Sequence, residues 1–336
     1  MRVLEVDPRD DGRWAAWYAV LDASLEHERP GDPHWTSREQ RASALRHHVA
    51  PGADRSALPR EDVLLQAGDA VALLSLHLAD NTHLADLELH VHPAARRRGL
   101  GTALLQEARC RAAVDGRTHL EIEVDEVTPD VPGVAFARRH GFACQLRDIR
   151  RDLALPVDPA RLDALEAQAR PQATGYELCT WQDRTPDELL ADRALIEVRM
   201  STDAPAGDLP VEQEAWDGAR IRDREALRTA QGRTAFSAGA LAGGRLVAHT
   251  EVAVPLAVPE RAYQWGTLVL AEHRGHRLGM LVKLAALRAL QAASPSTRSV
   301  STWNAEGNTP MIAVNEALGF VPVGTLSSWT QRLAAA

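Results

Sequence analysis

Two short segments of the chain combine arginine and glycine, just before a helical pattern, in a way that suits phosphate binding. Backbone amides at the start of a helix lack partners within it, and the helix dipole there favours negative charge. Glycine lets an anion approach the backbone, and arginine adds positive charge. The sequence therefore predicts two anion-binding loops, formed by Val91, Arg96, Arg97, Arg98, Gly99, Leu100, Gly101 and Thr102, and by Val269, Arg274, Gly275, His276, Arg277, Leu278, Gly279 and Met280.

Neither segment matches the other common phosphate-binding loops. The chain contains no Gly-Lys-Ser or Gly-Lys-Thr sequence and no G-x-G-x-x-G sequence, which excludes a P-loop and a dinucleotide-binding fingerprint. Arg277 stands where the first segment has Gly99, so we expect the second loop to be the more crowded and the weaker anion site. A strand-to-helix turn with a solvated basic cap is the structural alternative for each.

Acidic residues alternate along the two predicted strands that flank the first loop. They are Asp86 and Glu88, followed by His90, on one strand, and Glu121, Glu123 and Asp125 on the next. Alternate residues of a strand point to one face, so these carboxylates would gather on one side of a sheet. Such a face is able to hold or deprotonate a cationic amine, with Glu88 as the candidate base. A solvent-facing polar side of a sheet is the alternative.

The second half of the chain carries a different set of candidate residues. His249 is the candidate base, and Asn304 and Asn315 are candidate hydrogen-bonding residues of the site. Asn308 could contact a ligand or cap the helix that follows it. Trp265 and Trp303 could line an acceptor pocket or pack in the core. The two halves are therefore not expected to have identical sites.

The residues around the two loops repeat at a constant spacing. Arg96 and Arg274 are 274 − 96 = 178 positions apart, and Gly101 and Gly279 are also 279 − 101 = 178 apart. Gly319, which follows a helical segment, lies 178 positions after another glycine in the same setting, Gly141. A constant offset over about fifty residues indicates a tandem duplication of one domain.

The predicted elements follow the same order in both copies. Strands are expected at 3–6, 62–66, 71–78, 85–91, 119–124 and 142–155, and helices at 14–28, 99–114 and 134–139. In the second copy strands are expected at 176–181, 235–241, 245–254, 264–270, 300–303, 320–323 and 329–333, and helices at 186–200, 212–230, 279–292 and 309–318. This order predicts an α+β fold with two domains, 1–155 and 176–336. Residues 156–175 would form the linker, with a helix at 160–169.

Composition excludes several classes of protein. The formal net charge is −8, so no broad basic surface for nucleic acid or anionic membranes is expected. The apolar runs are too short for a membrane-spanning helix, and the N-terminal residues lack a signal-peptide pattern, which predicts a cytoplasmic protein. The three cysteines form no CxxC pair, so neither a disulfide framework nor a metal site is expected.

The first loop resembles the pyrophosphate-binding motif of the GNAT superfamily of acyl-CoA-dependent N-acyltransferases. That motif is Gln or Arg, two residues, Gly, one residue, then Gly or Ala, and Arg96, Gly99 and Gly101 stand at its positions. The pairs Gly141-Phe142 and Gly319-Phe320 resemble the end of the family's last motif. The resemblance covers both halves, and this tandem layout is similar to mycothiol synthase and related actinobacterial acetyltransferases.

The resemblance implies two GNAT-like domains, each a mixed, mostly antiparallel sheet flanked by helices. Acetyl-CoA or another acyl-CoA would lie between diverging strands, with its diphosphate on the amides of 97–102 or, in the second copy, of 275–280. The amine would attack the thioester directly in a ternary complex. The family's usual acid is a tyrosine four residues before the glycine of Gly-Phe, and here Ala137 and Asn315 occupy that position.

The resulting hypothesis is an N-acyltransferase that moves an acyl group, acetyl by default, from CoA to a primary amine of a small molecule. One alternative keeps the fold but takes the acyl group from the phosphopantetheine of an acyl carrier protein. A second alternative is a non-catalytic CoA-binding sensor or scaffold, because neither copy has the tyrosine. No metal, nucleic acid or membrane partner is expected.

Overall fold

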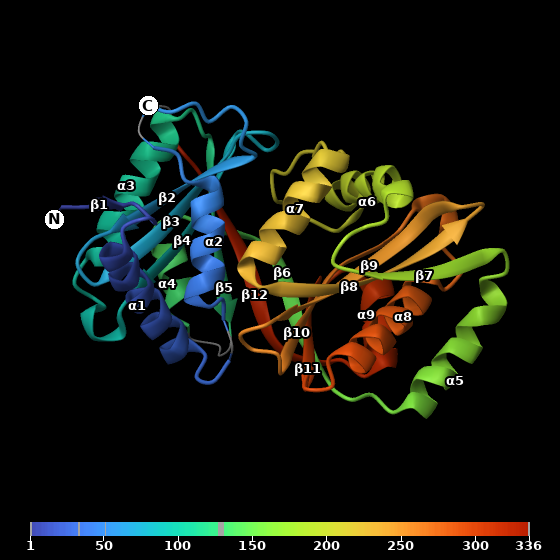
Figure 1. Cartoon of the computed structure of the whole chain (residues 1–336). Coiled ribbons are helices and arrows are strands. Elements are labelled where there is room, and N and C mark those ends of the chain that lie inside the picture. Colours follow the sequence, from blue (N-terminus) through green and yellow to red (C-terminus); the bar gives the residue numbers. More distant parts are fainter. Residues whose placement is uncertain (1, 33, 51, 127–130, 335–336) are drawn as a thin grey trace. The chain divides into compact units, whose positions relative to one another are not determined.

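The computed structural model describes residues 2–32, 34–50, 52–126 and 131–334, which form two compact units (Figure 1). The first unit comprises Met1–Arg147, Gly207–Val211 and Thr325–Ala336, and the second comprises Asp148–Ala206 and Glu212–Gly324. This division differs from the predicted domains 1–155 and 176–336, since parts of each predicted domain lie in the opposite unit. Each unit is an α+β structure with one mixed sheet.

The two units exchange equivalent strands, which is why the predicted boundaries fail. Strand β6 (Ala143–Ala154) and strand β12 (Val321–Arg332) start and end 178 positions apart, as 321 − 143 and 332 − 154 show. Yet β12 pairs antiparallel with β5 (His119–Glu126), and β6 pairs antiparallel with β11 (Ser299–Ala305). The last strand of each half therefore completes the sheet of the other unit. Strand β12 is also continuous, whereas the sequence suggested two strands, 320–323 and 329–333.

The strands of the first unit pair in the order β1-β2-β3-β4-β5-β12. Only the β4–β5 pair is parallel. The remaining strands are β1 (Leu4–Val6), β2 (Arg60–Gln66), β3 (Ala70–His77) and β4 (Leu84–Val91), and the helices are α1 (Asp11–Glu28), α2 (Ser37–His47), α3 (Leu100–Val114) and α4 (Pro132–Arg139).

Alternation along the strands divides the core of this unit between the two sheet faces. Leu64 packs with Trp17 of α1, whereas the next residue, Leu65, belongs to the cluster that contains Leu104 of α3. Helices α1 and α2 therefore cover one face, and α3 and α4 cover the other. Helix α2 was missed by the sequence analysis, because its 11 residues are mostly polar and only its capping box, Thr36 with Glu39, signals its start.

The second unit has the strand order β6-β11-β10-β9-β8-β7, with β10–β11 as the parallel pair. Its helix α5 confirms the helix expected at 160–169, while α7 starts later than the expected residue 212. The elements not yet given are α5 (Pro159–Ala169), β7 (Tyr176–Gln182), α6 (Leu190–Asp203), α7 (Gly218–Gln231), β8 (Arg233–Ala242), β9 (Arg245–Pro255), β10 (Arg261–Val269), α8 (Leu278–Ala293) and α9 (Thr309–Leu318). Within the described residues, no helix has the length and apolar character needed to cross a membrane.

Candidate acyl-donor and acceptor sites

In each unit the parallel strand pair separates after three paired positions. The β4–β5 pairing ends at Asp86 and Glu121, and the β10–β11 pairing ends at Tyr263 and Ser301. Beyond these points the backbones of the two strands are no longer paired, although each strand keeps its other neighbour and the Thr302 hydroxyl donates to the carbonyl oxygen of Gln264 at 3.5 Å. Unpaired strand edges can bond to an extended ligand as an added strand would. Both units therefore have the diverging strands that the family resemblance implies.

The two predicted loops have the same backbone conformation with the roles of arginine and glycine interchanged. Arg97 and Gly99 have φ of 65° and 81°, and the equivalent Gly275 and Arg277 have φ of 84° and 56°. A Cβ atom added at Gly99 would meet nothing within 4 Å. Arg277 itself is exposed, and its Nε atom donates to Gln172 Oε1 at 3.4 Å. The expectation that Arg277 makes the second loop the weaker anion site stays a prediction.

Both loops lead into helices whose first amides are left open. Gly99 caps α3 and Arg277 caps α8, and neither helix has a side-chain hydrogen bond at its N-terminus. Helices α4 and α6 also lack such a bond, whereas α1, α2, α5, α7 and α9 each have one from their capping residue. The open amides, together with the exposed side chains of Arg97, Arg98, His276 and Arg277, suit an anionic diphosphate. These amides and side chains are the groups of the chain that fit the diphosphate of CoA.

Two of the predicted phosphate-binding arginines act instead as ties within the fold. Arg96 donates to the carbonyl oxygen of Val91 at 3.2 Å and to Glu28 at 2.7 Å. Arg274 makes the same pair of contacts, with Val269 at 3.2 Å and Asp203 at 2.6 Å. Each arginine thus joins its loop to the end of the preceding strand and to a helix, which is α1 for Arg96 and α6 for Arg274. The arginine of the motif positions the loop, and the open amides remain to meet a phosphate.

The acidic face predicted in the first unit is present, but its most perturbed carboxyl group is Glu121 rather than Glu88. Burial tends to raise the pKa of Glu88, yet hydrogen bonds with His90 (3.1 Å) and Gln40 (3.4 Å) hold that pKa below its usual value. Burial, with repulsion from Asp86 and Glu123, raises the pKa of Glu121 to about 7. Glu121 is therefore the residue of this face that can gain and lose a proton near neutral pH.

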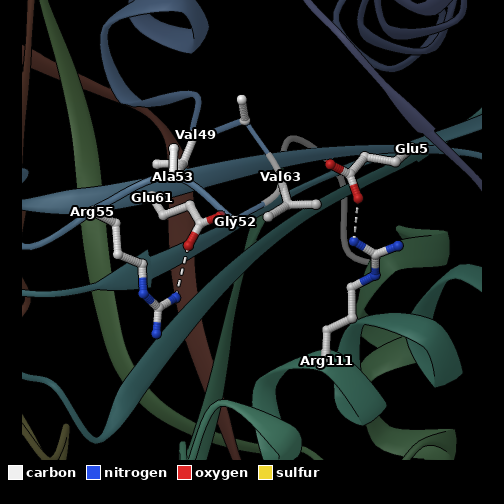
Figure 2. Close-up of a pocket in the computed structure, with 9 residues that line it drawn as sticks. Glu5, Val49, Gly52, Ala53, Arg55, Glu61, Val63 and Arg111 are labelled. Atoms are coloured by element: carbon white, nitrogen blue, oxygen red, sulfur yellow. Dashed lines mark hydrogen bonds and ion pairs between the residues drawn. The ribbon is translucent and has the colours of Figure 1, made fainter.

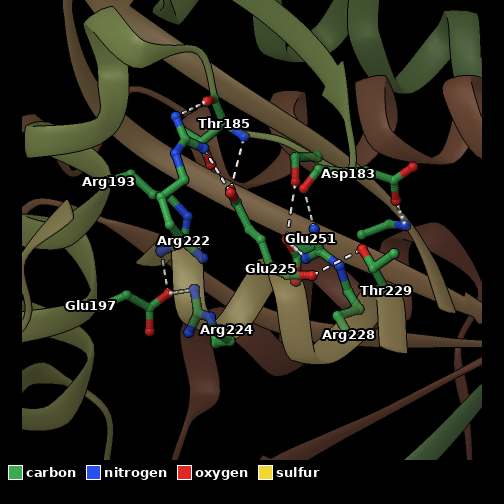
Figure 3. A network of polar contacts seen from close by, with 12 residues as sticks. Asp183, Thr185, Arg193, Glu197, Arg222, Arg224, Glu225, Arg228, Thr229 and Glu251 are labelled. Carbon is green, nitrogen blue, oxygen red and sulfur yellow. Dashed lines mark hydrogen bonds and ion pairs between the residues drawn. The ribbon is translucent and has the colours of Figure 1, made fainter. Parts of the chain in front are cut away.

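His249 lies in a buried ionic network, shown in part in Figure 3, that fastens α6 and α7 to the sheet of the second unit. Its ring stacks on Trp181 with centroids 5.3 Å apart, and its Nε2 atom has no hydrogen-bond partner among the described residues. Burial, reinforced by the positive charges of Arg193, Arg224 and Arg228, lowers the pKa of His249 well below its ordinary value. His249 is only 2% exposed, so its predicted role as a base that meets substrate is not supported.

Paired charges account for the rest of this network. Arg193 and Arg224 both bind Glu197, and Arg228 donates to Glu251 at 2.7 Å. Burial alone would raise the pKa of Glu197, but the two arginines lower it to about 2. The network therefore has a structural role in holding the helices.

Asn315 is fully buried, and Asn304 is the half-buried residue at the separation of β10 and β11. Asn315 Nδ2 donates to Asn304 Oδ1 at 2.6 Å, and Lys283 Nζ of α8 donates to Asn315 Oδ1 at 2.8 Å. The structure thus brings the two predicted asparagines together, and it adds Lys283. Sequence reasoning missed Lys283, although it is the only lysine in the chain and stands among apolar residues of a helix.

Strand β10 has a bulge beside this asparagine pair. Its register with β9 shifts between Gln264 and Thr267, which leaves Trp265 and Gly266 outside the regular pairing, whereas the β3–β4 register of the first unit is continuous. A bulge frees backbone groups and re-aims side chains. Trp265 and Trp303 are both half-buried, and Tyr263 stacks on Trp303 with ring centroids 6.2 Å apart. The guanidinium group of Arg233 lies over the rings of Tyr263 and Trp265. Asn308 caps α9, which confirms the prediction that this residue is a helix cap.

A separate pocket of about 320 Å³ lies in the first unit, away from the loop residues (Figure 2). Its charged lining residues are already paired, Arg55 with Glu61 at 2.7 Å and Arg111 with Glu5 at 2.6 Å. It therefore adds no group to the candidate sites. Across the described part of the chain, no cluster of three or more His, Cys, Asp or Glu residues could hold a metal ion.

Comparisons with known proteins agree with this geometry. Residues 60–144, which include the first loop, match the model of the acetyltransferase (GNAT) domain. A search of curated protein sequences gave no match. A solved tandem GNAT protein from the clavulanic acid biosynthesis pathway is 29% identical, with a TM-score of 0.76 over 100% of this chain and 99% of that one.

Two more distant structures share the fold. A GCN5-related N-acetyltransferase from Sphaerobacter thermophilus is 17% identical, with a TM-score of 0.64 over 99% of this chain and 95% of that one. The N-myristoyltransferase of Saccharomyces cerevisiae, solved with myristoyl-CoA, is 12% identical, with a TM-score of 0.58 over 98% and 80%. Residues 60–144 thus match a GNAT acetyltransferase domain, and the chain as a whole has the fold of a solved tandem GNAT protein.

Proposed function

We propose that this protein transfers an acyl group, acetyl by default, from acyl-CoA to a primary amine of a small molecule, and that the reaction takes place in the second unit. The observation that carries the proposal is the asparagine pair at the separation of β10 and β11, next to a bulged strand and an open helix N-terminus. The first unit has the loop and the diverging strands, but Ala137 replaces Asn315 and its strand is not bulged.

The donor side of the site follows from the loop and the strands. The diphosphate of CoA would rest on the open amides of the loop, and the extended pantetheine arm would bond to the unpaired edges of β10 and β11. Acetyl-CoA is the default donor of this proposal, and the solved tandem GNAT protein is described as a structure without AcCoA, which names the same donor. Both units have what is needed to bind CoA, so we expect two donor sites and one reacting site.

The proposed chemistry forms one bond and breaks another. The neutral amine attacks the thioester carbon, a C–N bond forms, the C–S bond breaks, and the amine loses a proton. The leaving thiolate has a pKa near 8.5 for an ordinary thiol, so it does not need a tyrosine acid. Asn304 would donate a hydrogen bond to charge that develops on the thioester. Because His249 is buried, the substrate ammonium would give one proton to solvent before the attack, and the nitrogen would give a second proton to solvent after the C–N bond has formed.

The first unit is the competing location for the reaction, because Glu121 has a pKa of about 7. Two variants separate the possibilities under the same assay, Asn304→Ala and Glu121→Gln. Release of free CoA is followed with acetyl-CoA and a panel of primary amines. We expect kcat to fall at least about tenfold in Asn304→Ala and by less than about twofold in Glu121→Gln. The reverse order would place the reaction in the first unit.

The same assay tests the proposal as a whole when it is combined with calorimetry of CoA binding. Amine-dependent release of CoA supports the acyltransferase. Binding of CoA without release for any amine would favour a sensor or scaffold. Turnover that requires an acylated carrier protein, with no binding of CoA, would identify the carrier-protein phosphopantetheine as the donor.

A further inference from the structure

Lys283 is the single lysine of this chain, and it is 1% exposed. Burial of an ammonium group is strongly unfavourable unless the group is paired, and lysine is rarely buried without a carboxylate. Among the described residues, its one hydrogen bond goes to the amide oxygen of Asn315, and the ring of Phe320 lies 5.5 Å from its Nζ atom. Methionine or leucine would fill the same volume without this penalty. The position therefore has a lysine for a reason other than packing.

The hydrogen bonds of this group run in one direction, from the interior to the strand edge. In its ammonium form Lys283 can only donate, so Asn315 then accepts with its oxygen and turns its NH₂ group toward Asn304. Asn304 accepts with its oxygen, and its own NH₂ group then remains to donate elsewhere. The buried lysine thus fixes the orientation of both amides. It also makes each successive NH₂ group a stronger donor, because connected hydrogen bonds polarise one another.

The equivalent positions of the first unit show that the fold does not require this polar chain. At an offset of 178 residues, Leu105 corresponds to Lys283 and Ala137 corresponds to Asn315. Leu105 and Ala137 are both fully buried in the core of the first unit. The helices therefore pack equally well around an apolar pair. The lysine and the asparagine occur together in one copy and are both replaced in the other, as expected if the two residues act together.

We propose that Lys283, acting through Asn315, orients and polarises Asn304 as the hydrogen-bond donor to the acyl thioester in the second unit. This proposal rests on the proposed function. Lys283 is a positioning residue, because Asn315 and Asn304 lie between it and the substrate. The ammonium would act only in its protonated form, in which its positive charge supports the charge that develops on the departing thiolate.

The protonation state of Lys283 makes the proposal testable. Burial lowers the pKa of Lys283 to about 7, and no charged side chain contributes to the shift. The groups that face it from the packed elements are neutral, namely Asn315 of α9, Phe320, and Asn304 of β11 beyond Asn315. A negative charge at Asn304 should favour the protonated lysine and raise its pKa.

The presence of one lysine allows a direct measurement. Protein labelled with ¹³C and ¹⁵N only in lysine gives one lysine side-chain signal, whose titration reports the pKa of Lys283 by NMR. We expect its midpoint to rise by about one unit when CoA is bound. The rise should persist in Gly99→Glu, which places a negative charge in the first loop, and disappear in Gly275→Glu, which places one in the second loop.

Kinetics supply the second readout, with variants matched to the first unit. In Lys283→Met, and in the double variant Lys283→Leu with Asn315→Ala, kcat should fall by roughly 10- to 100-fold while KM for acyl-CoA changes by less than about threefold. The wild-type kcat should also decline at alkaline pH as the lysine loses its proton, and this decline should be absent in Lys283→Met. Leu105→Met, at the equivalent position of the first unit, should behave as the wild type.

The outcomes separate this inference from the proposed function. If no amine is acylated by the wild type, the proposed function fails. If the wild type turns over and CoA binds in the second unit, an unmoved lysine midpoint overturns the role of Lys283, even where kcat falls in the variants. Wild-type kcat and an unchanged alkaline decline in Lys283→Met would overturn it as well.

Discussion

Replacement of the buried lysine should change how the stability of the second unit depends on pH. In the unfolded chain Lys283 holds its proton up to a pKa near 10.5, whereas in the folded protein its pKa is about 7. Between these values the unfolded state binds more protons than the folded state, so the free energy of unfolding rises with pH. Lys283→Met removes this contribution and keeps an apolar side chain of similar length.

The size of the effect follows from the two pKa values. Between pH 7 and pH 9 the lysine should raise the free energy of unfolding of the wild type by about 2 kcal/mol relative to Lys283→Met. Below pH 7 both states hold the proton, and the difference between the two proteins levels off. This change of stability with pH is opposite in sign to that of a salt-bridged lysine, whose contribution to stability is lost as pH rises.

The measurement is urea unfolding of both proteins at pH 7, 8 and 9, with hydrogen exchange of peptides from α8 used to observe the second unit by itself. Leu105→Met in the first unit is the matched control, because it alters the same position of the fold without a titrating group. Parallel stability curves for the wild type and Lys283→Met over this range would refute the reasoning, since they would mean that the buried ammonium keeps its ordinary pKa.

Three further expectations concern the loops, the acceptor and the ionic network. Gly99→Glu and Gly275→Glu should each remove one of two CoA sites in calorimetry by charge repulsion, and a variant that retains both sites at wild-type affinity would contradict the loop assignment. The rising limb of the profile of kcat/KM against pH should move to lower pH with amines of lower pKa, and a limb that stays fixed would indicate a protein base instead. Glu197→Gln should destabilise the second unit by roughly 3–5 kcal/mol in chemical denaturation because Arg193 and Arg224 lose their buried partner, while a loss under about 1 kcal/mol would mean that water replaces it.

Local features of the sequence were enough to predict the repeat, both loops and most of the secondary structure. The loop conformation depends on a few adjacent residues, and the following helices show their periodicity over four turns, so both can be found without knowledge of the fold. The asparagine position was also found locally, since Asn315 lies four residues before Gly319. Helix α2 was missed because it has few apolar residues to mark a buried face.

The identity of the reacting groups depended on contacts between distant residues. Lys283 and Asn315 are 32 residues apart, and nothing near either in the sequence shows that a lysine ammonium meets an amide. In the same way, His249 qualifies as a base by residue type, and only the arginines of α6 and α7 show why it is a poor one. Protonation depends on the three-dimensional arrangement of burial and charge, and residue type sets only its starting value.

The duplicated sequence determined that two similar sheets would form, each with a phosphate-binding loop and a parallel pair that separates. Only the tertiary structure decided which strand completes which sheet, because β6 and β12 hold the same place in the repeat. The physical reason is that strand pairing relies on backbone hydrogen bonds, which are the same for every sequence, so the place of a strand in the repeat does not by itself select its partner. The choice between the two pairings therefore falls to the packing of the complete chain.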